Sequence, residues 1–265
     1  MNGLSLFKMT AHENYKGQVL WVAVAIGFIT LALMALMSES AINHQSRLVD
    51  VASYFLVDIV AVITATFMGS FLYSRDFSNR GIAELAIPSG LSRVRLFFWR
   101  WFSHSVCLFL FVTVLYGVRL LSFWIAASST PTLVRDTLLM VLLTSFKSIL
   151  AFSLAACLGC FARPVIALVG CIGIFAIGHF SSGLQGVQGM LDESRLISPF
   201  EAFLYKVLRV WNPGLLTLES LKGAWEQISI AELAMRIGWG MAAITFFASV
   251  AFLSVRNRDI GALDL

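Results

Sequence analysis

Long apolar runs separated by shorter polar segments dominate the pattern of this chain. A run of roughly 20 apolar residues is long enough for a helix to cross about 30 Å of hydrocarbon. Such runs predict six membrane-spanning helices, at approximately Val19–Met37, Val51–Tyr73, Leu96–Val118, Thr137–Phe161, Pro164–Phe180 and Ile237–Val255. The fifth run begins soon after the fourth ends, so we expect a tight turn around Arg163 and Pro164. Proline suits the start of a helix, where its missing N–H is harmless.

The composition agrees with this pattern. Hydrophobic residues make up 58% of the chain and charged residues only 13%, about half the charged share of a soluble domain. The mean hydropathy is +0.84. The net charge of +4 is too small and too dispersed to indicate a nucleic-acid partner. The sequence therefore predicts an all-α integral membrane protein, with residues 1–265 forming a single membrane domain in contact with lipid.

Lysine and arginine predict the orientation, because they favour the cytoplasmic side of membrane proteins. With the N-terminus inside, the inner side receives Lys8, Lys16, Arg75, Arg80, Arg93, Arg95, Arg100, Arg163, Arg256 and Arg258. We expect a multi-pass protein of the plasma (inner) membrane with both termini in the cytoplasm.

A charged segment, Asp76 to Arg100, interrupts the apolar pattern between the second and third predicted spans. Ile82, Leu85 and Ala86 give a short helix one apolar face, and Pro88 ends it. Such a helix, within a cytoplasmic loop at 74–95, can lodge in a groove on a partner protein. The alternative is a solvated loop whose arginines only set the topology.

At these residues the chain resembles the permeases of type-2 ABC exporters. In that family the loop between spans two and three reads approximately acid-x(3–4)-Gly-Thr-hydrophobic-Glu-x-Leu-Leu-x-x-Pro-x-Ser-Arg, followed by a basic residue. The residues at matching positions here are Asp76, Gly81, Glu84, Pro88, Arg93 and Arg100. Ile82 replaces the usual threonine, Ala86 interrupts the paired leucines, and Ser89 and Gly90 lengthen the stretch before Ser92.

The resemblance implies a transport subunit rather than an enzyme. Two permease copies, here expected as a homodimer, would pair with separate ATP-binding subunits that hold ATP and Mg²⁺. The chain has no GxxxxGK[ST] phosphate loop, in agreement with this expectation. The second loop would dock on the ATPase as a coupling helix, with its interface formed by Asp76, Arg80, Gly81, Glu84, Pro88 and Arg93. A six-span scaffold or assembly factor, or a membrane enzyme, is the alternative.

Two further segments carry amphipathic patterns. Residues 1–17 mix apolar and charged positions and predict an interfacial helix, similar to the connecting helix of the family, with a disordered tail as the alternative. The segment 181–231 opens with Gly183, Gly186 and Gly189, which we expect to be flexible. An apolar stripe follows, with Phe200, Phe203 and Trp211 as candidate residues of an extracytoplasmic gate. Simple packing on the outer surface is the competing interpretation.

Ionisable residues inside predicted spans are candidates for a functional site, because charges are costly there. Asp58 in the second span and Lys147 in the fourth lie at similar depths, so the two can pair or line a polar path. Cys157 and Cys160 form a CxxC that we interpret as packing residues. His104, Cys107 and His179 are too few and too dispersed to predict a metal site.

Overall fold

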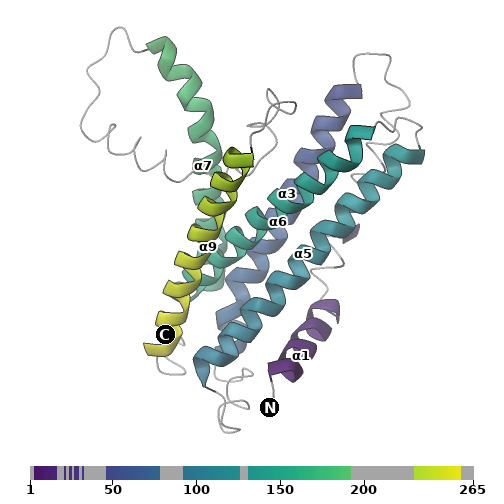
Figure 1. Cartoon of the computed structure of the whole chain (residues 1–265). Helices are drawn as coiled ribbons and strands as arrows, with labels where there is room; N and C mark the ends of the chain where they lie inside the picture. Colours follow the sequence, from purple (N-terminus) through teal and green to yellow (C-terminus); the bar gives the residue numbers. More distant parts are fainter. Residues whose placement is uncertain are drawn as a thin grey trace.

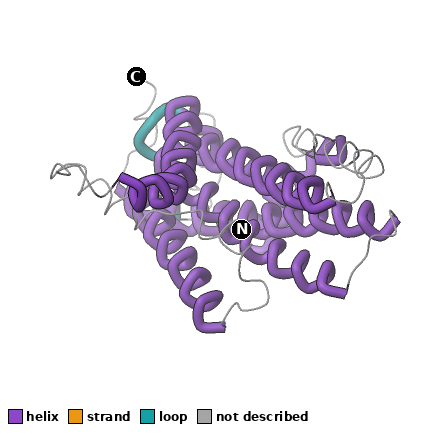
Figure 2. The backbone as a smooth tube through the Cα atoms, turned by 90° about the horizontal axis from the view of Figure 1, so that it is seen from above, coloured by secondary structure: helices purple, strands orange, loops and turns teal. Residues whose placement is uncertain are grey.

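Helix accounts for almost all of the described chain. The computed structural model describes residues 3–16, 21, 24–25, 27–29, 32, 46–77, 92–125, 131–191 and 230–257. The long elements are α1 (Gly3–Lys16), α3 (Ser46–Phe77), α5 (Arg93–Ile125), α6 (Pro131–Gly159), α7 (Pro164–Leu191) and α9 (Ile230–Asn257). These residues include no strand, and the turn at 160–163 is the main break in helix (Figures 1 and 2). The all-α prediction is confirmed for this part of the chain.

Four of these helices are long and apolar enough to cross a membrane. The candidate spans are Ser53–Leu72 in α3, Arg93–Leu121 in α5, Thr137–Gly159 in α6 and Leu233–Arg256 in α9. The predicted fifth span corresponds to a shorter apolar stretch of α7, Pro164–Gly178. Most of the predicted first span lies outside the described residues. The sequence-based locations of the second, third, fourth and sixth spans agree with the helices observed.

Several helix ends differ from the apolar boundaries. Helix α3 continues to Phe77, and α5 already begins at Arg93, because the Ser92 side chain caps it by accepting a hydrogen bond of 3.3 Å from the Arg95 amide. Helix α7 runs through Gly183, Gly186 and Gly189 to Leu191. The expectation of flexible backbone at these glycines is wrong. Each glycine costs a helix only about 1 kcal/mol, which a long helix tolerates.

The turn between α6 and α7 is as tight as the sequence predicts. Helix α6 ends at Gly159 and α7 begins at Pro164. The amides of Phe161 and Ala162 both donate to the Leu158 carbonyl, at 2.9 Å. The Arg163 carbonyl then accepts the first bond of α7, from the Ala167 amide at 3.0 Å. These bonds satisfy carbonyls at the end of α6 that have no partner within the helix.

Helix α6 is the centre of the bundle. It packs against α3, α5, α7 and α9, and 67% of its span is buried, compared with 28% of the α9 span. In Figure 1, α3, α5 and α6 run side by side, α9 lies on one side of this group, and the short α1 lies beside the lower part of α5. The start of α5, the end of α9 and all of α1 therefore lie at the same end of the bundle.

Small residues bring α3 and α6 into close contact. Ala61, Ala65 and Gly69 repeat every four residues along α3, as do Ala151, Ala155 and Gly159 along α6, and all six are buried. A Cβ on Gly69 would collide with the Phe152 carbonyl oxygen and lie 2.9 Å from the Ala155 Cβ. A Cβ on Gly159 would lie 2.9 Å from the Ser70 carbonyl oxygen. Helix backbones packed this closely are typical of membrane proteins, where interfaces are rich in small residues.

Several hydroxyl groups in the α3 and α6 spans are satisfied within their own helices. Thr64, Thr66 and Ser70 donate to carbonyls four residues earlier in α3, each at 2.8 Å. Ser148 and Ser153 do the same in α6, also at 2.8 Å. Such bonds allow serine and threonine to lie in an apolar span without an unsatisfied polar group.

The close contact predicts a specific sensitivity at Gly69. Gly69→Ala should lower the free energy of unfolding by about 1–3 kcal/mol, because the added methyl group forces two backbones apart. The matched control is Gly117→Ala on α5, where a Cβ meets nothing within 4 Å. That change should leave stability unchanged or raise it by up to about 1 kcal/mol. Thermal unfolding of the detergent-solubilised protein measures both, and equal effects would contradict this packing.

Candidate functional site

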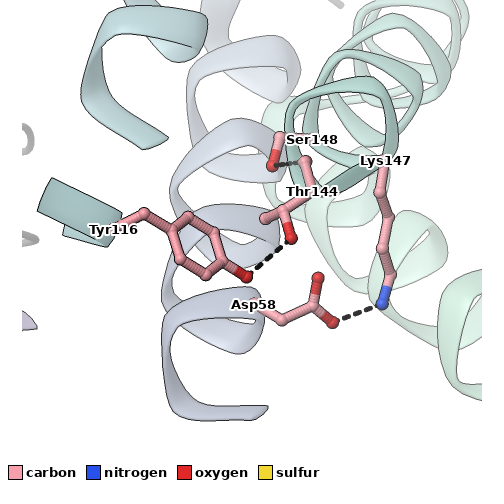
Figure 3. Close-up of polar contacts among 5 residues, drawn as sticks. All are labelled: Asp58, Tyr116, Thr144, Lys147 and Ser148. Atoms are coloured by element: carbon pink, nitrogen blue, oxygen red, sulfur yellow. Dashed lines mark hydrogen bonds and ion pairs between the residues drawn. The ribbon is translucent and has the colours of Figure 1, made fainter. Parts of the chain in front are cut away.

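Asp58 and Lys147 form an ion pair between α3 and α6. The Lys147 ammonium donates to Oδ2 of Asp58 (Figure 3), and the Lys147 side chain is only 1% exposed while that of Asp58 is 14% exposed. The pairing that the sequence left open is therefore present. Asp58 Oδ1 is buried and accepts no hydrogen bond from any described residue. One carboxylate oxygen thus neutralises Lys147, and the other is an acceptor position without a donor in the described part of the chain.

Two hydroxyl groups extend the polar site toward α5. The Tyr116 hydroxyl of α5 and Thr144 Oγ1 of α6 are 2.9 Å apart and share a hydrogen bond. Thr144 precedes Lys147 by three residues, and Figure 3 shows both hydroxyls on the side of α6 where Asp58 lies. The Thr144 backbone carbonyl in turn accepts a hydrogen bond from Ser148. Helices α3, α5 and α6 therefore each contribute polar groups to one place.

Arg119 continues the site along α5. Its side chain is fully buried, its Nε donates to Ser53 Oγ at 2.9 Å, and its guanidinium lies 3.5 Å from the centre of the Tyr54 ring. The Tyr54 and Tyr116 rings are 6.0 Å apart, which connects Arg119 to the hydroxyl pair. We call Ser53, Tyr54, Asp58, Tyr116, Arg119, Thr144 and Lys147 the polar cluster.

Contacts within the polar cluster offset part of the cost of holding charges inside the membrane. A single charged residue at the centre of a span costs about 2.5–3.5 kcal/mol, and pairing Lys147 with Asp58 offsets part of that cost. The face of an aromatic ring stabilises a nearby cation, as Tyr54 does for Arg119. Because its members come from three helices, the cluster is sensitive to their relative positions. It therefore has the properties of a helix-register lock or of a polar position on a path through the bundle.

The other residues singled out in the sequence fall into three groups: residues at helix ends, residues outside the described part of the chain, and buried cysteines. Asp76 lies in the last turn of α3, and Arg93 is the first residue of α5 and is half-buried. Arg80, Gly81, Glu84 and Pro88 lie outside the described residues, as do Phe200, Phe203 and Trp211. Cys157 and Cys160 are buried free thiols, in keeping with the interpretation as packing residues.

The histidine and cysteine positions form no metal site in the described part of the chain. His104 is buried with its ring 5.7 Å from that of Phe152, and Cys107 is half-buried on the same helix. Among the described residues, no group of three or more His, Cys, Asp and Glu residues is placed to hold a metal ion.

A second ion pair, of a buried arginine with a half-buried glutamate, attaches α1 to α5. Arg100 is fully buried, and its Nη1 donates to Glu13 Oε2 at 2.6 Å and to Thr10 Oγ1 at 3.0 Å. The Phe7 and Phe102 rings pack 6.3 Å apart beside it. Residues 3–16 therefore form a docked helix, and the alternative of a disordered tail does not hold for them.

The sequence-based interpretation did not identify Arg119 or the pairing of Arg100 with Glu13. The third span was expected to end at Val118, so Arg119 fell just outside it. The three-residue spacing of Tyr116 and Arg119 places both on one helix face and is the signal that was available. The partner of Arg100 is 87 positions away in sequence, and no local pattern indicates it.

Two comparisons with known proteins bear on the family of this chain. No protein-family model matches it, and no curated protein matches it significantly. The structure nevertheless defines its class. Four candidate spans carry large apolar side chains on their outer faces, among them Phe109, Val114, Phe246 and Leu253, where a soluble protein would carry polar ones. The chain is a multi-span helical membrane protein.

Removing one partner of the Asp58–Lys147 pair should cost more than removing both. Asp58→Asn and Lys147→Met each leave a buried group unpaired, and we expect each to lower the free energy of unfolding by about 3–5 kcal/mol. The double variant should be more stable than either single variant, because paired buried charges contribute little relative to neutral residues. A double-mutant cycle from thermal unfolding in detergent measures this coupling. Simple additivity would mean that the two side chains do not interact.

The attachment of α1 can be tested separately. Glu13→Gln removes the charge that Arg100 binds, and charged hydrogen bonds contribute about 1.5–3 kcal/mol. Amide hydrogen exchange in α1 should therefore accelerate tenfold or more, while α6 remains protected. Lys8→Gln is the matched control, because Lys8 is exposed on the same helix. Unchanged exchange in Glu13→Gln would show that this pair does not hold α1.

Proposed function

We propose that this chain is the permease subunit of an ATP-driven exporter of the type-2 ABC class. Two copies would form the translocation pathway, and ATP would bind with Mg²⁺ to a separate ATP-binding subunit. The chain would cross the membrane six times with both termini in the cytoplasm. The observation that carries the proposal is the pattern of Asp76, Gly81, Glu84, Pro88 and Arg93 between two candidate spans.

The helices on either side of this pattern support the proposal. Helix α3 extends to Phe77 and α5 begins at Arg93, so helical backbone approaches the connecting segment from both ends. Helices α3 and α5 also pack against each other. A partner protein that pushes on the segment between α3 and α5 would therefore move both helices together.

The position of α1 supports it as well. Thr10 and Glu13 hold α1 to Arg100, two turns after the start of α5. Helix α1 and the first turns of α5 thus form one unit at the end of the bundle where the connection begins and ends. In this proposal α1 is the interfacial helix beside the ATPase, and it moves with α5.

The contacts of the polar cluster would change when α5 moves. Tight packing of Gly69 against α6 makes α3 and α6 a rigid pair, whereas Tyr116 and Arg119 belong to α5. A shift of α5 relative to that pair changes the Tyr116–Thr144 and Arg119–Ser53 contacts while Asp58 stays paired with Lys147. The closing of two ATP-binding subunits would drive such a shift through the loop that contains Glu84.

Charge reversal at Glu84 tests the proposal. The chain is co-expressed with the ATP-binding cassette protein of a neighbouring reading frame, purified, and reconstituted in vesicles. We expect the two proteins to co-purify and Glu84→Arg to reduce permease-dependent ATP turnover to that of the ATPase alone, because ion pairs fix register at the interface. The amount of folded permease should not change.

Glu219→Arg is the matched control, because in this topology Glu219 lies on the opposite side of the membrane. Its ATP turnover should equal that of the unsubstituted complex. Failure of the two proteins to associate, or normal turnover in Glu84→Arg, would overturn the proposal and favour a scaffold or assembly factor.

A further inference from the structure

A row of aromatic rings crosses three helices at one end of the bundle. Phe252 of α9 lies 6.0 Å from Phe98 of α5, Phe98 stacks 6.3 Å from Phe102, and Phe102 lies 6.3 Å from Phe7 of α1. Helices α9 and α1 flank α5 on opposite sides in Figure 1. Residues far apart in the sequence therefore form one continuous aromatic surface.

This surface faces outward from the bundle. Phe98 is 44% exposed and Phe102 is 41% exposed, although both belong to a candidate membrane span. Phe252 connects the row to the interior of the bundle, because its ring packs edge-on against that of the buried Phe97, with the ring centres 5.2 Å apart. Trp99 packs against both rings, 5.9 Å from Phe98 and 6.2 Å from Phe102, and tryptophan at the end of a span is typical of the boundary between hydrocarbon and lipid headgroups.

Two arginines border the row on the side away from the hydrocarbon. Arg95 precedes Phe98 by three residues and Arg256 follows Phe252 by four, so each shares a helix face with its phenylalanine. Both side chains are exposed, and neither forms an ion pair with another described residue. Helices α5 and α9 pack together, with Phe98 against Phe252, so Arg95 and Arg256 lie about one turn from the same contact between the two helices.

Helix length places these arginines at the level of the headgroups. The α5 span, Arg93–Leu121, contains 29 residues and is therefore about 43 Å long at about 1.5 Å per residue, compared with about 30 Å of hydrocarbon. Because a charged residue in the hydrocarbon is costly, we expect the excess length at the start of α5, where Arg95 lies, and the α9 span ends at Arg256. We therefore expect both arginines in the headgroup layer and Phe98 about one turn deeper.

We propose that Arg95 and Arg256 bind the phosphate of an anionic phospholipid in the leaflet that surrounds this end of the bundle, with an acyl chain over Phe98 and Phe102. Guanidinium groups bind phosphate oxygens through paired hydrogen bonds, and basic positions between membrane helices attract anionic headgroups. Free phosphate would make the same polar contacts. The adjoining aromatic row favours a lipid, because only a lipid covers both parts of the surface.

Native mass spectrometry of the purified full chain tests this proposal. Dioleoyl phosphatidylglycerol and dioleoyl phosphatidylcholine are added at equal concentrations, and their adducts are compared. We expect a preference for phosphatidylglycerol that falls about fivefold for each arginine removed and about 25-fold in Arg95→Gln/Arg256→Gln. Each cation near an anionic lipid surface strengthens binding by about this fivefold factor. Arg95→Lys/Arg256→Lys keeps both charges without the paired hydrogen bonds, so its preference should lie between that of the unsubstituted chain and that of Arg95→Gln/Arg256→Gln.

Three comparisons make the result decisive. Arg163→Gln removes another exposed arginine, in the turn between α6 and α7, and should leave the preference intact. Phe98→Ala/Phe102→Ala should weaken both lipid adducts. Inorganic phosphate should not displace phosphatidylglycerol. The proposal fails if Arg163→Gln lowers the preference as much as the double variant does, if the double variant keeps it, or if inorganic phosphate competes fully.

Discussion

The close approach of α3 and α6 is the constraint on which the rest of the bundle depends. Alanine and glycine at every fourth position let the two backbones touch at Gly69 and Gly159, and a helix side chain of any size at either place would separate them. Because the helices cannot slide past a backbone contact, their register is fixed along their whole length. That register brings Asp58 beside Lys147, about three turns from Gly69. The ion pair is thus a consequence of small residues elsewhere on the same two helices.

Three buried cations follow one rule. Lys147 meets Asp58, Arg100 meets Glu13, and Arg119 meets Ser53 and the Tyr54 ring, in each case on another helix. In an apolar surrounding such contacts add little to stability relative to well-packed neutral residues, but separation of the partners is costly. The two ion pairs therefore define an α3–α6 unit and an α1–α5 unit. The Arg119–Ser53 and Tyr116–Thr144 contacts lie between these units.

The fold was predictable from local patterns wherever hydrophobicity alone decides the structure. The runs that became the spans of α3, α5, α6 and α9 were visible because no other structure satisfies the backbone in lipid. The turn before Pro164 was predictable because proline is favoured at the first position of a helix. The helix ends were less predictable. Ser92 caps α5 four residues before the apolar run begins, and α7 continues through three glycines, since caps and helix continuation do not follow hydrophobicity. The depth of Asp58 and Lys147 was predictable, but their contact was not.

The sequence by itself therefore determined the class of the protein, the helical segments and the fact that certain charges must lie inside the membrane. Only the tertiary structure decided which of those charges meet. The reason is physical: hydropathy is a property of one segment against its solvent, whereas pairing depends on the rotation and register of two helices that are distant in sequence. Arg100 meets Glu13 only when α5 packs against α1. The aromatic row from Phe7 to Phe252 likewise forms only when α5 packs between α1 and α9. Helix packing determines that rotation and register, and in this chain the backbone contacts at Gly69 and Gly159 restrict the register most strongly.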